Sequence, residues 1–442
     1  MSMQHAEIFR ENFFRENFYR ENYYDEKSFS GKNDFPAQEL NLLLHRAFIN
    51  SPFYGEKLKK AGFKPGVSLD YECFFRLPFT EKHELRQAEP LAHLAVPEEQ
   101  VVRIHSSSGT TGKPVVIPYT KKDVDDWSEM MARSLQTAGV SVKDRVHITP
   151  GYGLWTAGIG FQAGVEKLGA MAVPIGPGNT DKQLELMIDL KSSVLIGTSS
   201  YGLLLAEEIA KRNLQRSICL KKGIFGSERW GEKMRGRIKE ILAIEVYDIY
   251  GLTEVYGPGI AIDCPYHQGM HYWSDYLFME VIDPLTEMPL PPGEVGELVI
   301  TTISKEAMPL IRYRTRDLTR LVPGCCPCGS SHPRIDRIVG RSDDMIKIKG
   351  VNIYPGQIDT ALMQAPGLSS EYQIVLTRHE GRDHMLIKVE KDPGADGAGL
   401  DKKVEETIKN SIGVTVSAEV VEYGSLPRSE KKTKRVFDLR EM

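Results

Sequence analysis

The sequence predicts an α/β protein with a large N-terminal domain of parallel βαβ units and an antiparallel subdomain, followed by a small C-terminal α/β domain. At 442 residues the chain exceeds what one hydrophobic core usually supports. From 145 to 250, short apolar runs alternate with helical stretches, which is typical of parallel βαβ units. From 278 to 320, two apolar runs flank a turn rich in Pro and Gly, which indicates antiparallel pairing.

The composition is that of a globular protein, with 41% hydrophobic and 26% charged residues. No apolar run approaches the ~18 residues of a membrane span, and the first residues lack the basic-then-apolar form of a signal peptide. A net charge of −4 gives no reason to expect nucleic acid. We therefore expect a cytoplasmic protein with neither nucleic acid nor membrane as a partner.

The chain is predicted to begin with a flexible lead segment, 1–36. Within it, 9–26 repeat a five-residue unit of aromatic, Arg, Glu and Asn residues. Because a helix has 3.6 residues per turn, residues repeated every five positions spread around it and do not form one face. A partner-binding aromatic peptide is the alternative interpretation. A first helix is expected over 39–61.

Five strands and three helices are expected in the βαβ region. The strands are 146–149, 171–175, 194–197, 223–226 and 246–250, and the helices are 180–191, 201–212 and 230–242. Further strands are expected at 278–283 and 296–302, and a hairpin-like strand at 345–350. Ligands of parallel sheets gather at the carboxyl ends of the strands, so the loops at 226–229 and 250–254 are the informative ones.

A loop rich in glycine and hydroxyl groups is the strongest local signal. It comprises Ser106, Ser107, Ser108, Gly109, Thr110, Thr111, Gly112 and Lys113. The glycines permit a tight turn, and successive backbone N–H groups in such a turn form a concavity that binds anions. The loop is not a Walker A motif, because Ser107 stands where that motif needs glycine. A strand at 115–117 follows it, and an ordinary polar loop remains the alternative.

Six segments in order resemble the adenylate-forming superfamily of acyl- and aryl-CoA ligases. They are 106–114, 151–158, 250–254, 309–317, 340–343 and 427–435. Within that superfamily the chain is similar to the phenylacetate–CoA ligase family, over residues ~40 to 442. The aromatic repeat departs from the family, and Lys431 stands where relatives often have glycine.

The resemblance implies a reaction in two steps. A carboxylate attacks the α-phosphate of MgATP to give an acyl-adenylate and pyrophosphate, and a CoA thiol then displaces AMP. Lys432 would neutralise charge between the carboxylate and the α-phosphate, and Thr253 would donate to that phosphate. Glu254 would hold Mg²⁺, since a hard cation prefers carboxylate oxygen. The large domain would span 37–342. The small domain, 343–442, would be mobile and rotate about Asp343 between the steps.

The same resemblance implies a nucleotide site. The 106–113 loop would hold the β- and γ-phosphates. Tyr250 would stack on adenine and Asp317 would accept from the ribose hydroxyls. The predicted nucleotide-binding residues are Ser227, Glu228, Arg229, Asp248, Ile249, Tyr250, Gly251, Thr253, Asp317 and Arg341. The plainer alternatives are a buried core tyrosine at 250, a solvated Glu254, and a salt-bridge cluster of Asp317 with its neighbours Arg312, Arg314, Arg316 and Arg320.

The acid and CoA sites are inferred from position. Small residues beside large flat ones suit an aromatic ring, although core packing explains each of them as well. The predicted acyl pocket comprises Tyr152, Trp155, Ala157, Gly158, Ile224 and Gly226. Lys349 and Gly350 would reach the site after rotation and line the CoA tunnel. The expected acid is phenylacetate or a close aryl acid.

Three of the six cysteines lie within four residues, at 325, 326 and 328, which favours metal binding over disulfides. Thiolate and imidazole together favour tetrahedral zinc, with free buried cysteines as the alternative. Because relatives carry the same arrangement, the predicted structural zinc ligands are Cys264, His271, Cys326 and Cys328. His267 and His332 are alternates.

Two other functional classes remain open. The adenylate could pass to a carrier-protein thiol or a deazaflavin coenzyme in place of CoA. The chain could also be a non-catalytic zinc protein that binds nucleotide, although the presence of Lys432, Asp317, Glu254 and the phosphate loop together argues against this. A homodimer and a part in phenylacetate catabolism follow only from the resemblance.

Overall fold

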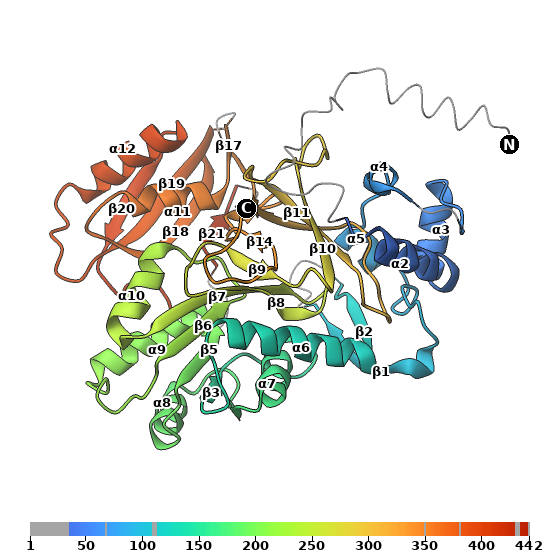
Figure 1. The fold of residues 1–442 in the computed structure, drawn as a ribbon. Helices are drawn as coiled ribbons and strands as arrows, with labels where there is room; N and C mark the ends of the chain where they lie inside the picture. The colour runs from blue at the N-terminus through green and yellow to red at the C-terminus, as the bar shows by residue number, and fades with distance from the viewer. Residues whose placement is uncertain are drawn as a thin grey trace.

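The computed structural model describes residues 35–66, 69–107, 113–348, 351–379, 382–428 and 434–440 (Figure 1). Several predictions from the sequence lie outside these residues. They concern the aromatic repeat 9–26, the loop positions Ser108, Gly109, Thr110, Thr111 and Gly112, the pair Lys349 and Gly350, and Lys432.

Four helices form the N-terminal part of the described residues, and three of them share a hydrophobic core. They are α2 (Ala37–Asn50), α3 (Pro52–Lys60), α4 (Tyr71–Phe75) and α5 (Lys82–Gln87). The prediction of one helix over 39–61 is wrong, because the helix is interrupted at Ser51, between α2 and α3. Ser51 is extended, with φ −99° and ψ 116°, and its side chain accepts a hydrogen bond from the Tyr54 amide. Pro52 causes the break, because proline disfavours helical geometry in the preceding residue.

A parallel sheet forms the centre of the large domain, as predicted. Its parallel strands are β3 (Arg145–Ile148), β4 (Met171–Pro174), β5 (Val194–Thr198), β6 (Lys222–Gly226) and β7 (Glu245–Leu252), in the order β4-β3-β5-β6-β7. The connecting helices are α7 (Ala157–Leu168), α8 (Thr180–Asp189), α9 (Ser199–Lys211) and α10 (Glu232–Leu242). Antiparallel strands extend the sheet beyond β7: β8 (Gly257–Asp263), β9 (Met270–Tyr272), β14 (Arg334–Ile335) and β13 (Leu321–Val322).

Two antiparallel units complete the large domain. A hairpin of β1 (Val101–Ser106) and β2 (Val116–Thr120) leads into α6 (Lys121–Thr137), after the short 3₁₀ helix η1 (Glu98–Gln100). The second sheet has the order β10-β11-β12-β15 and confirms the predicted antiparallel subdomain. Its strands are β10 (Leu277–Ile282), β11 (Gly296–Thr302), β12 (Tyr313–Thr319) and β15 (Gly340–Arg341).

The C-terminal region has a sheet and a hydrophobic core of its own. Its elements are β16 (Ile346–Ile348), β17 (Val351–Ile353), α11 (Pro355–Met363), β18 (Leu368–His379), β19 (Arg382–Lys391), α12 (Leu400–Ile412), β20 (Ser417–Val421) and β21 (Val436–Asp438). The strands β16 and β17 pair antiparallel, as the predicted hairpin required, and the main sheet has the order β20-β19-β18-β21. In Figure 1 this orange and red region lies beside α10.

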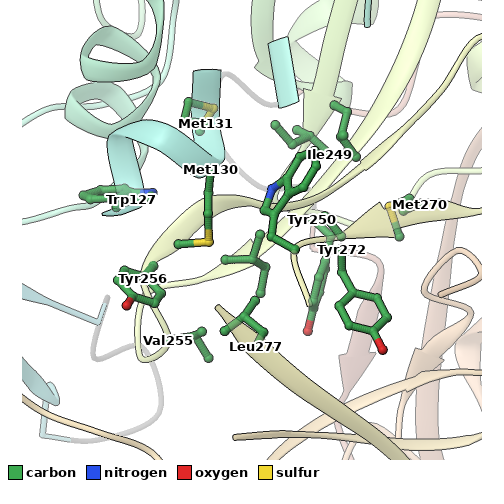
Figure 2. Close-up of a cluster of buried hydrophobic side chains, with 14 of the residues drawn as sticks. Trp127, Met130, Met131, Ile249, Tyr250, Val255, Tyr256, Met270, Tyr272 and Leu277 are labelled. Atoms are coloured by element: carbon green, nitrogen blue, oxygen red, sulfur yellow. The ribbon is translucent and has the colours of Figure 1, made fainter. Parts of the chain in front are cut away.

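The main core joins α6 to the middle of the central sheet (Figure 2). Trp127, Met130 and Met131 of α6 pack with residues of β7, β8 and β9 and are at most 1% exposed. Helix α7 approaches α6 closely at Gly160, where a Cβ atom would lie 2.2 Å from the Trp127 ring. No helix in the described ranges is long and apolar enough to cross a membrane.

We predict opposite effects for two Gly→Ala substitutions in helices. Gly160→Ala should lower the free energy of unfolding by about 1–3 kcal/mol, because the rigid indole of Trp127 leaves no space for a methyl group. Gly236→Ala on α10 meets no atom within 4 Å and should raise it by about 0.5–1 kcal/mol. Denaturant titration of both variants measures the difference. Equal effects would contradict the packing described for α6 and α7.

Candidate active site

The glycine-rich loop connects β1 to β2, so a strand follows it, as expected from the sequence. The Ser107 amide donates to the Val115 carbonyl at 3.0 Å, and the Val115 amide donates back to the Ser107 hydroxyl at 2.9 Å. The Ser106 amide donates to the Leu154 carbonyl, which fastens the hairpin to the loop at 151–156. Lys113 is exposed at the other end of the loop. Ser107 therefore closes the base of the loop.

A triangle of side chains forms where β7, β12 and β15 meet. The Tyr250 hydroxyl donates to Asp317 Oδ2 at 2.6 Å, and Arg341 donates to Asp317 Oδ1 at 3.2 Å. Asp317 and Arg341 are directly paired residues of neighbouring strands. Burial raises the pKa of Asp317, although the Arg341 charge opposes this. Burial also raises the pKa of the Tyr250 hydroxyl well above its usual range, so this group stays a donor.

The arginines next to Asp317 in sequence do not pair with it in the described residues. Arg312 pairs with Glu280, Arg314 with Glu297, and Arg320 with Asp336, all within 3.0 Å. Arg316 pairs with Glu81 and Glu297. Arg341, 24 residues away, is the one that reaches Asp317. A local salt-bridge cluster therefore does not explain Asp317, whose carboxylate keeps acceptor capacity beyond its two partners.

Thr253 and Glu254 follow β7 directly. Thr253 shares a 3.2 Å hydrogen bond with the Thr156 hydroxyl at the start of α7. Glu254 is 4% exposed, and the Lys82 ammonium of α5 lies 2.8 Å from its Oε1 atom. The alignment is not that of a hydrogen bond, and Oε1 accepts none within the described part of the chain. A carboxylate keeps further lone pairs beside this ammonium, and buried carboxylate oxygen fits a hard cation such as Mg²⁺.

Sequence reasoning missed Lys82. It lies 172 positions before Glu254, in a short helix with no motif of its own. Only the packing of α5 against β12 and the 253–254 turn brings the two groups together.

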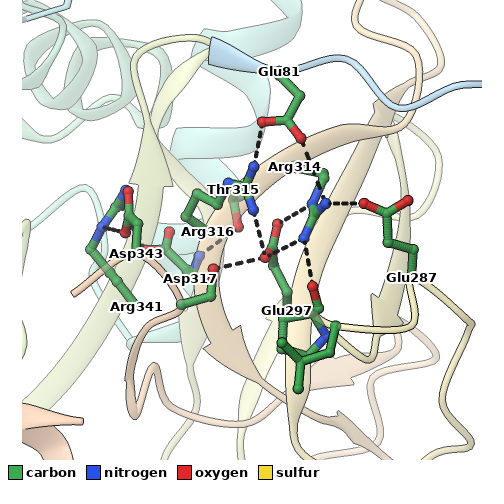
Figure 3. A network of polar contacts seen from close by, with 12 residues as sticks. Glu81, Glu287, Glu297, Arg314, Thr315, Arg316, Asp317, Arg341 and Asp343 are labelled. Atoms are coloured by element: carbon green, nitrogen blue, oxygen red, sulfur yellow. Dashed lines mark hydrogen bonds and ion pairs between the residues drawn. The ribbon is translucent and has the colours of Figure 1, made fainter. Parts of the chain in front are cut away.

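The segment 341–343 is tied into a network of buried charges (Figure 3). Arg341 makes two hydrogen bonds of 2.9 Å to Asp343. The Ser342 hydroxyl donates to the fully buried Glu297 at 2.7 Å. Glu297 also accepts two hydrogen bonds from Arg314, at 2.8 and 3.0 Å, and Arg316 binds Glu81. The predicted hinge residue therefore follows a firmly anchored turn.

The residues after β6 have structural contacts of their own. Ser227 has a positive φ of 69°, and Glu228 accepts from the Ser200 amide at 2.7 Å, at the N-terminus of α9. Arg229 donates to the Gly356 carbonyl and to Asp359, both at 3.0 Å, and so contacts the C-terminal region. Because the Glu228 and Arg229 side chains are engaged within the protein, we expect a ligand in this region to contact the backbone.

The remaining predicted nucleotide residues lie along β7. Asp248 accepts from the Trp230 indole at 3.2 Å, and burial raises its pKa to about 6. Ile249 is buried in the core and pairs with Gly226 across the sheet. Gly251 allows close backbone approach, since a Cβ atom there would lie 2.0 Å from the Gly257 carbonyl oxygen.

The predicted acyl-pocket residues fall into two groups. Tyr152, Trp155, Ala157 and Gly158 lie together at the start of α7, where a Cβ atom on Gly158 would lie 2.8 Å from the Tyr152 ring. Trp155 is 46% exposed, and the Tyr152 hydroxyl is buried without a partner in the described structure. In contrast, Ile224 is fully buried in the core, and Gly226 packs against the Ile249 backbone. The structure therefore brings the first group together, whereas Ile224 and Gly226 lie in the packed interior of the sheet.

A second site combines Cys264, His271, Cys326 and Cys328. One ligand atom from each lies within 4.8 Å of the others. The Cys264 and Cys326 sulfur atoms are 3.6 Å apart, and Cys328 Sγ is 3.2 Å from His271 Nε2. His271 Nδ1 lies 2.8 Å from the His332 carbonyl, which orients Nε2 toward the sulfur atoms.

The two alternate histidines are engaged elsewhere. His267 Nδ1 lies 2.6 Å from Asp263 Oδ2, and the His332 ring lies near the Ser274 hydroxyl. The predicted set of four is thus the set that the structure brings together. Its three sulfur atoms and one imidazole fit the tetrahedral preference of zinc.

Comparison with known proteins agrees with this geometry. The profile of the AMP-binding enzyme family matches residues 55–304, and that of the AMP-binding enzyme C-terminal domain matches 350–440. A phenylacetate-coenzyme A ligase of Escherichia coli is 42% identical over 91% of this chain and 94% of its own. The Thermus thermophilus protein of the same name is 41% identical over 91% and 95%.

Solved structures with a similar fold include two states of one ligase. A 2-hydroxyisobutyryl-CoA ligase in the postadenylation state matches with a TM-score of 0.83 at 29% identity, covering 97% of both chains. The same ligase in the thioesterification state matches with a TM-score of 0.66, covering 96% of this chain and 95% of its own.

Fold and site together define an AMP-binding enzyme with the adenylate-forming fold. The chain belongs to the phenylacetate–coenzyme A ligase family. The predicted family, fold class and enzyme class, an acid–CoA ligase, are confirmed by these matches.

Proposed function

We propose that the chain ligates phenylacetate, or a close aryl acid, to coenzyme A in two steps. A carboxylate oxygen of the acid attacks the α-phosphorus of ATP, the α–β phosphoanhydride bond breaks, and pyrophosphate leaves. The CoA sulfur then attacks the acyl carbon, the bond to phosphate breaks, and AMP leaves. The observation that carries the proposal is the Tyr250–Asp317–Arg341 triangle beside the buried Glu254 carboxylate, which is paired with Lys82 at 2.8 Å. Identity above 40% with phenylacetate-coenzyme A ligases supports the choice of acid.

Asp317 would anchor the nucleotide. It is held by Tyr250 and Arg341, and its remaining lone pairs can accept from both ribose hydroxyls. Tyr250 would offer its ring face to adenine, opposite the 227–229 backbone. Arg341 would add positive charge next to the ribose.

Four parts of the chain would bind the reacting phosphates or neutralise their charge. Thr253 would donate to the α-phosphate, and the 106–113 loop would hold the β- and γ-phosphates. Glu254 would hold Mg²⁺, which neutralises phosphate charge when bound. Lys432, outside the described residues, would bridge the acid and the α-phosphate.

The aryl ring of the acid would lie beside the cluster at the start of α7. Tyr152 and Trp155 supply flat apolar faces, and Ala157 and Gly158 leave space between them. No charged residue is predicted there, which suits an acid whose far end is apolar.

The second step would use a different arrangement of two domains, 37–342 and 343–442, divided at Asp343. Lys349 and Gly350 would then line the path of CoA. The solved states of the 2-hydroxyisobutyryl-CoA ligase support such an exchange, because one protein adopts postadenylation and thioesterification states. A homodimer, a cytoplasmic location and a part in phenylacetate catabolism stay predictions.

Pyrophosphate release from MgATP across a panel of carboxylic acids, with and without CoA, tests the proposed function. We expect release with phenylacetate, and AMP together with an acyl-CoA product only when CoA is present. Acetate and a long-chain fatty acid serve as control substrates and should give little release. Release without any acyl-CoA product would contradict CoA as the acceptor, and no release with any acid would contradict the enzymatic function.

We also propose that Cys264, His271, Cys326 and Cys328 hold a structural zinc ion. All four tetrahedral positions would be filled by protein, so the ion would fasten loops and leave no open position for chemistry. It would tie the end of β8 and strand β9 to the 325–329 turn. Free buried cysteines remain the competing interpretation of the same cluster.

Metal analysis of the purified protein separates these two interpretations. We expect about one zinc per chain, because structural sites of this ligand set bind tightly. Cys326→Ser should lose the metal and lower the free energy of unfolding by about 4 kcal/mol or more. Cys219→Ser, at an exposed cysteine, is the matched control and should change neither quantity. Wild-type protein without zinc, and as stable as Cys326→Ser, would contradict the proposal.

A further inference from the structure

A group of charged residues joins the large domain to the C-terminal region at a distance from the proposed reacting atoms. Glu207 lies on α9 and Arg237 on α10, and both face the turn after β20. Tyr423 and Arg428 belong to that turn. The Tyr423 hydroxyl donates to Glu207 Oε1 and accepts from Arg237, and the Arg428 Nε group donates to Glu207 Oε2 at 3.2 Å.

Glu207 is the centre of this contact. Each of its carboxylate oxygens binds a residue of the C-terminal region, and Arg237 Nε lies 3.4 Å from Oε1. The Arg237 guanidinium also lies over the Tyr423 ring, 4.5 Å from its centroid. The Glu207 side chain is 19% exposed, so water screens these contacts only in part.

Arg428 has a second partner within its own domain. It makes two hydrogen bonds to the fully buried Glu390 of β19, at 2.8 and 2.9 Å. The Leu426 amide donates to the same carboxylate at 2.8 Å. Glu390 therefore holds the turn in shape within the C-terminal region, and Glu207 docks the turn on the large domain.

A lysine makes a second contact between the large domain and the C-terminal region. The Lys233 ammonium of α10 donates to the carbonyls of Leu362, Ala365 and Leu368, at 2.9 to 3.1 Å, between the last turn of α11 and the start of β18. Its three protons are matched by three acceptors. The negative end of the α11 dipole strengthens the contact.

These contacts exist in one arrangement of the domains. The chain matches the postadenylation state of the 2-hydroxyisobutyryl-CoA ligase with a TM-score of 0.83 and its thioesterification state with 0.66, at nearly the same identity and coverage. The two matches differ in arrangement, and the docked Glu207 and Lys233 belong to an arrangement that resembles the first state.

We infer that Glu207 and Lys233 are positioning residues that hold the C-terminal domain in the arrangement for adenylation, and so favour the first half-reaction over the second. The inference rests on the proposed two-step function. The contacts must break before a different arrangement can form. A ligand-independent contact of this kind sets how much of the protein is competent for each step.

Two half-reactions, measured separately, test the inference in the full-length enzyme. The first is exchange of labelled pyrophosphate into ATP with phenylacetate and no CoA. The second is acyl transfer from preformed phenylacetyl-adenylate to CoA. Glu207→Gln should lower the first rate at least about tenfold, since it removes the charge that pairs with Arg428, and should leave the second unchanged or faster.

Two further variants complete the design. Lys233→Met, at the other end of the interface, should change the ratio of the two rates in the same direction. Its effect carries the test if Glu207→Gln does not fold. Glu208→Gln is the matched control, because Glu208 lies next on α9 and pairs with Lys211 and Arg212 of its own neighbourhood. It should leave both rates within about twofold of the wild type.

The outcomes separate the inference from the function on which it rests. Wild-type exchange with an unchanged ratio of rates in Glu207→Gln and Lys233→Met would overturn the inference alone. A proportional loss of both half-reactions would overturn it as well, because a general structural defect lowers both. Absence of exchange by the wild type with every acid would overturn the proposed function, and with it the step that these residues are inferred to favour.

Discussion

The buried carboxylate of Glu297 is the constraint on which the geometry of the candidate site depends. It is fully buried on β11, where an uncompensated charge would cost several kcal/mol. Arg314, Arg316 and the Ser342 hydroxyl compensate it with charged and neutral hydrogen bonds. Three segments therefore meet at one group: strand β11, strand β12 and the turn that precedes Asp343. None of them can shift without exposing an unpaired charge in the interior.

A strained residue in β12 connects the buried Glu297 to the candidate site. Arg316 has a φ of +68°, in the left-handed region that costs a non-glycine residue roughly 1–2 kcal/mol. The Ser342 amide donates to the Arg316 carbonyl at 2.7 Å, and Glu81 and Glu297 bind its side chain. The β11–β12 pairing is irregular between Glu297 and Val299. An irregularity of this kind turns the next side chain, Asp317, toward Tyr250 and Arg341.

The order of strands and helices could be predicted from the sequence because local periodicity governs it. The parallel units 146–250 and the 278–302 hairpin were of this type. The helix over 39–61 failed at Pro52, where one residue outweighs the apolar pattern on both sides. For the cysteine cluster, spacing left His267 and His332 as alternates to His271. The structure brings His271 to the sulfur atoms, where the His332 carbonyl orients its ring, while the Asp263 carboxylate engages His267.

Contacts between distant segments could not be predicted. The Lys82–Glu254 ion pair and the Arg341–Asp317 hydrogen bond join residues whose separation carries no periodic signal. The arginines closest to Asp317 in sequence made a local cluster the natural expectation, yet they bind Glu81, Glu280, Glu297 and Asp336. The docking contacts of Glu207 arise in the same way, since α9 and the turn after β20 meet only once both domains have folded.

The most direct test of the central claim, that Asp317 is held by Tyr250 and Arg341 to bind the ribose, is a double comparison of nucleotide affinity by titration calorimetry. ATP and 2′,3′-dideoxy-ATP would be titrated into the wild type and into Asp317→Asn. We expect loss of the hydroxyls to weaken binding at least about tenfold in the wild type, as hydrogen bonds to a charged group do, and less than about threefold in the variant. The same loss of affinity in both proteins would contradict the claim, because the hydroxyls would then be bound elsewhere.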